Sequence, residues 1–289
     1  MTFLGVRAGR PGEAASVAIL GIPRGVDYPG IEPACADAPA AIRQRSQRLA
    51  HFADHWDFDL SGPMIPDELR IVDCGDVRAP GEAEATVRGV LAAGGTPIVL
   101  GGDDSVPIPM LRAFACLPGP ISVLQVDAHL DFRDQVAGVR DGYSSGMRRA
   151  SEMTHVEGIL QVGMRGVGSA READLDDARA AGNQIVTARE LRTRGAAAVA
   201  AQLPEGRPLV VSFDLDGLDP SVAPGVRALA PGGLSYEEAC DLLTAAAARA
   251  PIVGAAFTEL APALDVNGLT ALVAVRLITH LLRGVASTG

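Results

Sequence analysis

Short apolar, β-branched runs alternate with longer alanine-rich stretches along nearly the whole chain. The apolar runs predict buried strands, whereas stretches with apolar residues at every third or fourth position predict helices. The predicted strands cover residues 17–22, 71–73, 97–100, 121–127, 159–164, 184–187, 209–216 and 252–259. The predicted helices cover residues 38–49, 82–93, 106–116, 169–181, 196–202, 235–248 and 269–282.

This alternation predicts an α/β fold of three layers, αβα, in which helices cover both faces of a central, mostly parallel sheet of about eight strands. No linker, repeat or change in composition divides the chain, so we expect residues 1–289 to form a single domain. Residues 51–66 lack a clear hydrophobic period, and we expect them to form a surface or interface loop.

The composition narrows the possible chemistry. The chain has 289 residues, a formal net charge of -10 and no lysine. The missing lysine excludes Schiff-base and pyridoxal-phosphate chemistry and the Walker-A phosphate site, because each needs an amine on the protein. The negative charge disfavours nucleic acid as a partner, since binding to phosphates requires clustered basic side chains.

The sequence also lacks the marks of a membrane or disulfide-rich protein. No apolar run reaches the roughly 18 residues of a membrane span, and the N-terminus has no basic-then-apolar signal pattern. The four cysteines lie far apart without a C-x-x-C pair, which argues against a zinc knuckle, a redox motif or a disulfide framework. We therefore expect a cytoplasmic protein with no membrane partner.

Ionisable side chains follow four of the predicted strands, at the edge where parallel α/β sheets bind ligands. An isolated aspartate after a strand is usually a helix cap, but so many carboxylates cannot all ionise in a partly desolvated site without cations. Oxygen ligands with a single histidine suit manganese or magnesium, and their number suits two ions. The residues are Asp104, Asp127, His129, Asp131, Asp214, Asp216 and Glu259.

Four motifs at these strand ends resemble those of the arginase–agmatinase ureohydrolase family. That family carries G-G-D-H-S, D-A-H-x-D, S-x-D-x-D-x-x-D-P and E-x-x-P in this order. The corresponding segments here are GGDDS (101–105), DAHLD (127–131), SFDLDGLDP (212–220) and ELAP (259–262). Weaker similarities extend the resemblance to nearly the whole chain, and the ordered set is far more specific than any one motif.

The resemblance implies two manganese ions per chain, with nickel or a mixed site as the alternative. Asp127 and Asp214 would bridge the ions, and Asp131 would act in catalysis by orienting a bridging hydroxide. Glu259 would bind the substrate guanidinium group, with Ser145 and Asp219 as further substrate contacts. The implied metal ligands are Asp104, Asp127, His129, Asp131, Asp214 and Asp216.

Two positions depart from the family pattern. Asp104 replaces the histidine of the first motif, and its spacing favours metal ligation over a purely structural role. A carboxylate in place of an imidazole would make the metal site harder and more negatively charged. Ser145 replaces a loop histidine, and serine cannot shuttle a proton near neutrality, which argues against agmatine as the substrate. Arg133, Arg148 and Arg149 offer a way to hold a substrate carboxylate, although for Arg148 and Arg149 the favoured interpretation is a helix on which they pair with acidic neighbours such as Glu152.

These observations lead to two functional hypotheses. The first is an agmatinase-like, binuclear-metal amidinohydrolase that cleaves a small cationic guanidino substrate (agmatine, a guanidino acid or a substituted guanidine) to urea plus an amine. The second is a weakly active or inactive homologue that serves as a structural or regulatory subunit beside an active paralogue. The resemblance also implies a homotrimer or homohexamer. Retention of five of the six family ligands favours the enzyme.

Overall fold

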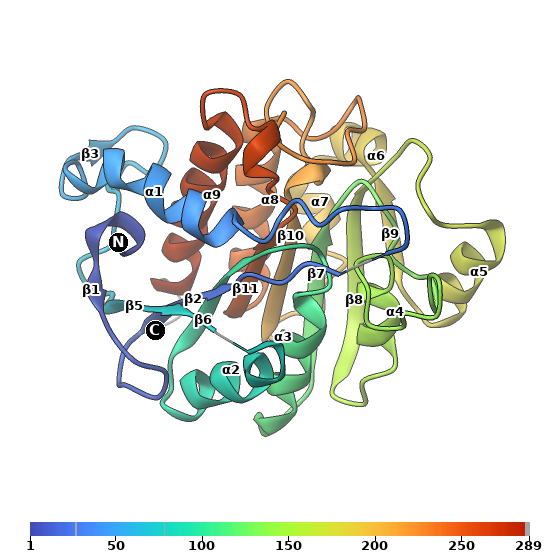
Figure 1. The fold of residues 1–289 in the computed structure, drawn as a ribbon, viewed down its shortest axis with the longest axis horizontal. Helices are drawn as coiled ribbons and strands as arrows, with labels where there is room; N and C mark the ends of the chain where they lie inside the picture. The colour runs from blue at the N-terminus through green and yellow to red at the C-terminus, as the bar shows by residue number, and fades with distance from the viewer. Residues whose placement is uncertain (27, 78, 287–289) are drawn as a thin grey trace.

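The computed structural model describes residues 1–26, 28–77 and 79–286, and consists of a central sheet between two layers of helices (Figure 1). Among the described residues this sheet has nine strands in the order β1-β5-β2-β6-β11-β10-β7-β8-β9, and all neighbouring strands are parallel. The sheet strands are β1 (Arg7–Ala8), β2 (Val17–Ile22), β5 (Ile71–Asp76), β6 (Thr96–Gly101), β7 (Ile121–Val126), β8 (Val156–Met164), β9 (Gln184–Thr187), β10 (Leu209–Asp214) and β11 (Ile252–Thr258). The helices are α1 (Ala38–Ala50), α2 (Ala83–Ala92), α3 (Pro107–Ala113), α4 (Gly146–Ser151), α5 (Glu172–Ala180), α6 (Ala188–Arg194), α7 (Ala196–Ala200), α8 (Tyr236–Arg249) and α9 (Leu269–Ala286).

Different helices cover the two faces of the sheet. One apolar cluster joins the sheet to α1, α6, α7, α8 and α9, and a second joins it to α2, α3, α4 and α5. In β7, Leu124 and Val126 belong to the first cluster and Val123 to the second, as expected for a strand that is buried on both faces. In Figure 1 the first group of helices lies mainly above the sheet, and α2, α3 and α4 lie below it.

The structure confirms the three-layer fold and all eight predicted strands. It adds the short strand β1 at one edge of the sheet and the helices α4 and α6, and the helix predicted from residue 169 begins only at Glu172. Residues 51–66, expected to form a loop, contain a small antiparallel pair of strands, β3 (Trp56–Asp57) and β4 (Gly62–Pro63). Within the described ranges, no helix is both long and apolar enough to cross a membrane.

The strands that carry the four sequence motifs are neighbours in space. In the sheet, β6 pairs with β11, β11 with β10, and β10 with β7. Because the strands are parallel, the residues that follow them emerge at one edge of the sheet. The fold therefore brings together segments that lie more than a hundred residues apart in the sequence.

Candidate metal centre and substrate pocket

The ionisable side chains after β6, β7, β10 and β11 surround a pocket of about 260 Å³. Asp127 is completely buried beneath it, and the other aspartates of the cluster are almost completely buried. The charged side chains that line this pocket are Asp104, His129, Asp131, Asp214, Asp216, Arg227 and Glu259.

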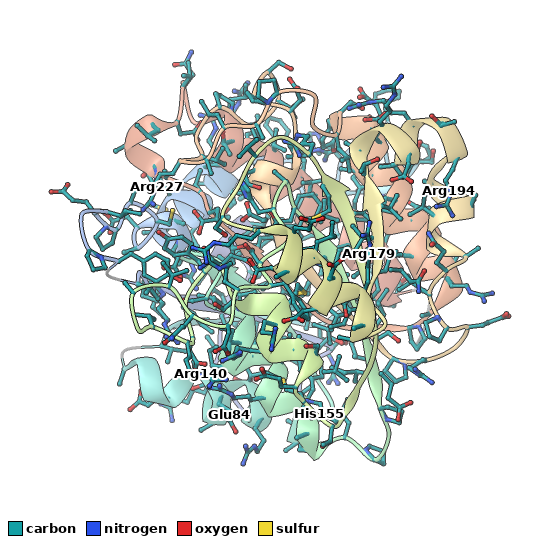
Figure 2. The ribbon with its side chains drawn as sticks, turned by 90° about the vertical axis from the view of Figure 1, so that its right-hand side faces the viewer. Glu84, Arg140, His155, Arg179, Arg194 and Arg227 are labelled. Atoms are coloured by element: carbon teal, nitrogen blue, oxygen red, sulfur yellow. The ribbon has the colours of Figure 1, made fainter. Side chains whose placement is uncertain are left out.

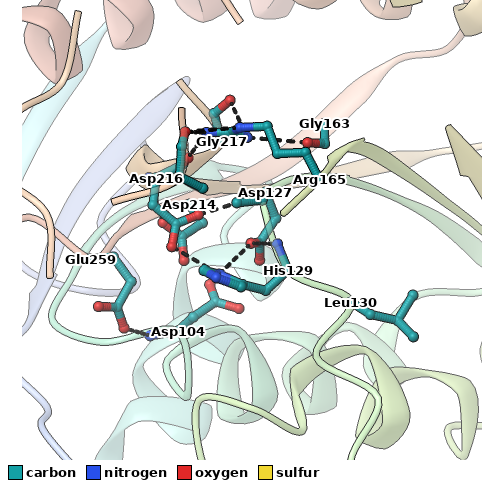
Figure 3. Close-up of polar contacts among 12 residues, drawn as sticks. Asp104, Asp127, His129, Leu130, Gly163, Arg165, Asp214, Asp216, Gly217 and Glu259 are labelled. Atoms are coloured by element: carbon teal, nitrogen blue, oxygen red, sulfur yellow. Dashed lines mark hydrogen bonds and ion pairs between the residues drawn. The ribbon is translucent and has the colours of Figure 1, made fainter. Parts of the chain in front are cut away.

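Four of the five aspartates fall into two groups that share one member, and Asp214, expected to bridge two ions, belongs to neither group. Potential ligand atoms of Asp127, His129 and Asp216 lie within 4.8 Å of one another, and the same holds for Asp104, Asp127 and Asp131. His129 Nδ1 lies 3.0 Å from Asp216 Oδ2 and 3.4 Å from Asp127 Oδ1, so its ring nitrogen faces the carboxylates (Figure 3). Asp127 therefore lies where it can serve two cations at once.

The turn after β7 aims these groups by hydrogen bonds within itself. The backbone N–H of His129 donates to Asp127 Oδ1 at 2.5 Å, and the N–H of Ala128 donates to Asp216 Oδ1 at 3.1 Å. Asp131 has a φ of 47°, in the left-handed region that aspartate tolerates better than most residues. On β10, Asp214 Oδ1 accepts a 2.7 Å bond from the N–H of Asp216, which holds that pair together.

Asp104 leaves one oxygen free for a cation. Its Oδ1 accepts a hydrogen bond from the Thr258 hydroxyl at 2.7 Å. Its Oδ2 is buried and has no hydrogen-bond partner among the described residues. A buried carboxylate oxygen without a partner is costly, so this atom fits a metal ligand better than a structural group. Together the two groups of potential ligands offer carboxylate oxygens and one imidazole nitrogen. Such a ligand set suits hard or borderline cations such as Mn²⁺.

Glu259, directly after β11, projects into the same pocket from a backbone with a φ of 66°. Its Oε1 accepts a hydrogen bond from the N–H of Asp104 at 2.9 Å, and its Oε2 accepts one from the Cys35 thiol at 3.4 Å. Both oxygens are thus oriented, while the carboxylate carries no ion pair with arginine among the described side chains. It remains available to a planar cation.

The electrostatics of the cluster are those of a site that needs cations. Burial and the neighbouring Asp127 raise the pKa of Asp131 well above its usual range, and burial and Asp216 raise that of Asp127 to about 6. Burial alone would lower the pKa of His129, but its hydrogen bonds with Asp127 and Asp216 raise it to about 11. Burial, with a contribution from Asp103, raises the pKa of Glu259 to about 7.

Removing divalent cations should make the stability of the folded chain fall as the pH rises. A carboxyl whose pKa is higher in the folded than in the unfolded state loses stability as the pH rises through its folded value, here about 6 for Asp127. The raised pKa of His129 acts in the same direction above about 6.5, its unfolded value. With chelator, we expect the melting temperature measured by circular dichroism to drop by about 5 °C or more between about pH 5 and pH 8.

With saturating Mn²⁺ the same protein should show a much smaller drop, because the cations replace the protons. A melting temperature of the chelated protein that is constant or rises over this range would contradict the proposed repulsion between buried carboxylates.

Behind the cluster, three buried amides form a chain of hydrogen bonds. Gln125 Nε2 donates to Asp127 Oδ2 at 2.6 Å, and Gln161 Nε2 donates to Gln125 Oε1 at 2.6 Å. Asn183 Nδ2 in turn donates to Gln161 Oε1 at 2.8 Å. Gln125 and Gln161 face each other on β7 and β8, so the sheet register itself aligns the chain. It holds one oxygen of the shared aspartate in a fixed orientation.

Comparison with known proteins identifies the family. A model of the arginase family matches residues 15–283. The chain belongs to the arginase family. Proclavaminate amidinohydrolase from Streptomyces clavuligerus is 31% identical to this chain in sequence, and the match covers 92% of this chain and 87% of the relative. The solved structure of that enzyme superimposes with a TM-score of 0.89 at 28% identity, covering 100% of this chain and 97% of the other.

Two further relatives show how varied the family is. An agmatinase from Bacillus anthracis is 29% identical over 94% of this chain and 92% of its own length. A formiminoglutamase from Trypanosoma cruzi, solved with Mn²⁺, has a TM-score of 0.85 and 26% identity and covers 99% of both chains. The family inferred from the four motifs is thereby confirmed.

In this arginase-family chain, two residues that were expected to contact the substrate, Ser145 and Asp219, do not line the pocket. Ser145 is buried at the start of α4 and does not line the pocket, whereas its neighbour Ser144 does. Asp219 also lies outside the lining. Its oxygens accept hydrogen bonds from the Ser221 hydroxyl and N–H and from the N–H groups of Gly232 and Gly233, and the Ser221 bonds above all lower its pKa to about 2. Asp219 therefore holds the loop that follows β10.

The three arginines considered for substrate binding contact acidic neighbours, as expected for Arg148 and Arg149. Arg148 contacts Glu152 and Asp177, and Arg149 contacts Asp134 and Glu152. Arg133 Nε lies 3.4 Å from Asp174 Oδ2. None of the three lines the pocket.

Several residues of the site were not predicted, and four of them make contacts that shape it. Cys35 contacts Glu259 from the loop before α1, and Tyr143 and Arg227 line the outer part of the pocket. Arg165, after β8, donates hydrogen bonds to backbone carbonyls around Asp216 and so fixes the turn after β10 (Figure 3). The only sequence signal for Arg227 is a basic residue seven positions after the end of the third motif, SFDLDGLDP (212–220).

Proposed function

We propose that this chain is a binuclear-metal amidinohydrolase that cleaves a small linear guanidino compound to urea plus an amine. The single observation that carries the proposal is Asp127, whose carboxylate belongs to both potential ligand groups in the pocket beside Glu259. A shared carboxylate is typical of paired metal ions that activate water for hydrolysis. Membership of the arginase family supports the same reaction class.

We assign the cations to the residues that the geometry groups. One would bind Asp127, His129 and Asp216, and the other Asp104, Asp127 and Asp131, with Asp214 beside both. When bound, such cations supply Lewis acidity and activate water as a nucleophile. Manganese is our first choice and nickel the alternative, since carboxylate ligands discriminate poorly between them.

The chain's own side chains would then hold and orient the substrate. The Glu259 carboxylate accepts hydrogen bonds from the guanidinium N–H groups and compensates their charge. Water adds to the guanidinium carbon, the bond from carbon to the alkyl nitrogen breaks, and the departing amine takes up a proton. We assign Asp131 the further role of orienting the attacking water, because its carboxylate lies within the ligand group beside Asp104 and Asp127. The convergence of all the candidate ligands disfavours an inactive structural subunit.

The deciding experiment is urea release by the purified protein reconstituted with manganese and, separately, with nickel. The substrates are agmatine, arginine, guanidinobutyrate, guanidinopropionate, guanidine and alkylguanidines, and metal content is measured on the same samples. We expect about two ions per chain and turnover of at least one compound. Less than one bound ion and no urea from any compound would refute the proposal.

A further inference from the structure

The pocket is electrically asymmetric. Its inner part carries the carboxylates at the strand ends, including Glu259. Its outer part is lined by Tyr143, Ser144 and residues 167–169 and 227–228, among which Arg227 is the one charged side chain. A ligand whose guanidinium group reaches Glu259 therefore extends toward a fixed positive charge.

Arg227 is held in place without being neutralised. Its Nη1 donates to the backbone oxygen of Glu32 at 2.8 Å, and its guanidinium carbon lies 5.7 Å from the centre of the Tyr143 ring. That ring packs against Tyr28, with 4.3 Å between ring centres. Among the described side chains, no carboxylate lies within ion-pair distance of Arg227. Several of its five N–H donors thus remain for a ligand.

Four other arginines, which follow β7 and β8 in the chain, do not line this pocket. The N–H groups of Arg165 donate hydrogen bonds to backbone carbonyls. The other three, Arg133, Arg148 and Arg149, contact acidic side chains outside the pocket. An arginine that is stacked on an aromatic ring and free of acidic partners is suited to bind a carboxylate through two parallel hydrogen bonds. An ammonium group at the same place would meet a like charge.

We propose that Arg227, positioned by Tyr143, binds the carboxylate of the substrate, so that the preferred substrates are guanidino carboxylic acids and not guanidino amines such as agmatine. This inference rests on the proposed amidinohydrolase function. It assigns the choice between substrate classes to Arg227, which follows the candidate metal ligand Asp216 in the loop after β10 and is not a ligand itself.

The test compares three compounds with similar chains, namely 5-guanidinopentanoate, agmatine and the uncharged-tail compound butylguanidine. For the metal-loaded wild-type protein we expect the highest kcat/KM with the acid and the lowest with agmatine. In Arg227→Gln, the ratio of kcat/KM for the acid to that for butylguanidine should fall about 30-fold, mainly through KM. Arg227→Lys should lose less of this ratio, because it keeps the charge but not the planar fork.

Arg194→Gln is the matched control, since Arg194 is exposed on α6 and lies on the opposite side of the view from Arg227 (Figure 2). It should leave the ratio unchanged. The inference is overturned if agmatine is the best wild-type substrate, or if Arg227→Gln lowers turnover of the acid and butylguanidine equally.

Calorimetric binding of 5-guanidinopentanoate to the same metal-loaded proteins separates this inference from the proposed reaction. No urea from any compound, together with acid binding that weakens in Arg227→Gln, would remove the hydrolase but retain the carboxylate site. Equal affinity of wild type and Arg227→Gln would overturn the carboxylate site whether or not urea is released.

Discussion

Replacing Glu259 with glutamine should lower kcat/KM for the best guanidino substrate by about 1,000-fold. Glutamine keeps an oxygen that can accept the hydrogen bond from the N–H of Asp104, so the local backbone should be preserved. It removes the negative charge and presents an amide N–H to a guanidinium group that has only donors. A buried cation left without its counter-charge is strongly disfavoured. The measurement is steady-state urea release at several substrate concentrations.

The metal content of Glu259→Gln should remain at about two ions per chain, because Glu259 belongs to neither ligand group. Glu172→Gln is a suitable control, since Glu172 lines a neighbouring cavity and lies outside the substrate pocket. Activity of Glu259→Gln within about threefold of wild type would show that the guanidinium group binds elsewhere.

Asp127→Asn should abolish binding of both cations and lower activity by at least about 1,000-fold. Asp127 is the only residue common to the two ligand groups found among the described residues, and asparagine offers a single neutral oxygen in place of two charged ones. Metal content per folded chain, measured by atomic emission after dialysis, should drop from about two to well below one.

Asp104→Asn provides the comparison, because Asp104 belongs to one group only. We expect it to retain about one ion per chain and a larger share of the activity. If Asp127→Asn and Asp104→Asn lose the same number of ions, Asp127 is not shared between two cations. Circular dichroism spectra of both variants should match that of the wild type, since both substitutions conserve side-chain shape.

The strands and their carboxylates could be predicted because the relevant signals are local. A buried strand such as β7 is a continuous apolar run, and aspartates at i and i+2, such as Asp214 and Asp216, share one face of an extended chain. In the structure β10 ends at Asp214 and Asp216 lies in a 3-10 turn, where the N–H of Asp216 binds Asp214 Oδ1 and keeps the pair together. The strand β1 has only two residues and is defined by its pairing with β5. No local sequence pattern indicates that pairing. The helices α4 and α6 are likewise too short for a clear period.

The remainder of the pocket could not be predicted, because it depends on loops that meet only in the folded chain. Cys35 and Glu259 are 224 residues apart, and Arg227 stacks on a tyrosine 84 positions earlier. Ser145 and Asp219 sit at the expected sequence positions, yet neither residue lines the pocket, because Ser145 is buried and Asp219 is bonded within its own loop. Motif spacing can locate a segment at the edge of a sheet, but the turn decides which of its side chains faces the ligand.

The amide chain from Asn183 through Gln161 to Gln125 links the outer strands to the shared aspartate. Each amide donates a hydrogen bond to the next side chain, so a substitution at Asn183 can reorient first Gln161, then Gln125 and finally the carboxylate of Asp127. Preference for one cation over another could therefore evolve, or be engineered, at Asn183 without touching any ligand. The measurement is the relative affinity of Asn183 variants for manganese and nickel, which would show whether this distant residue influences the metal centre.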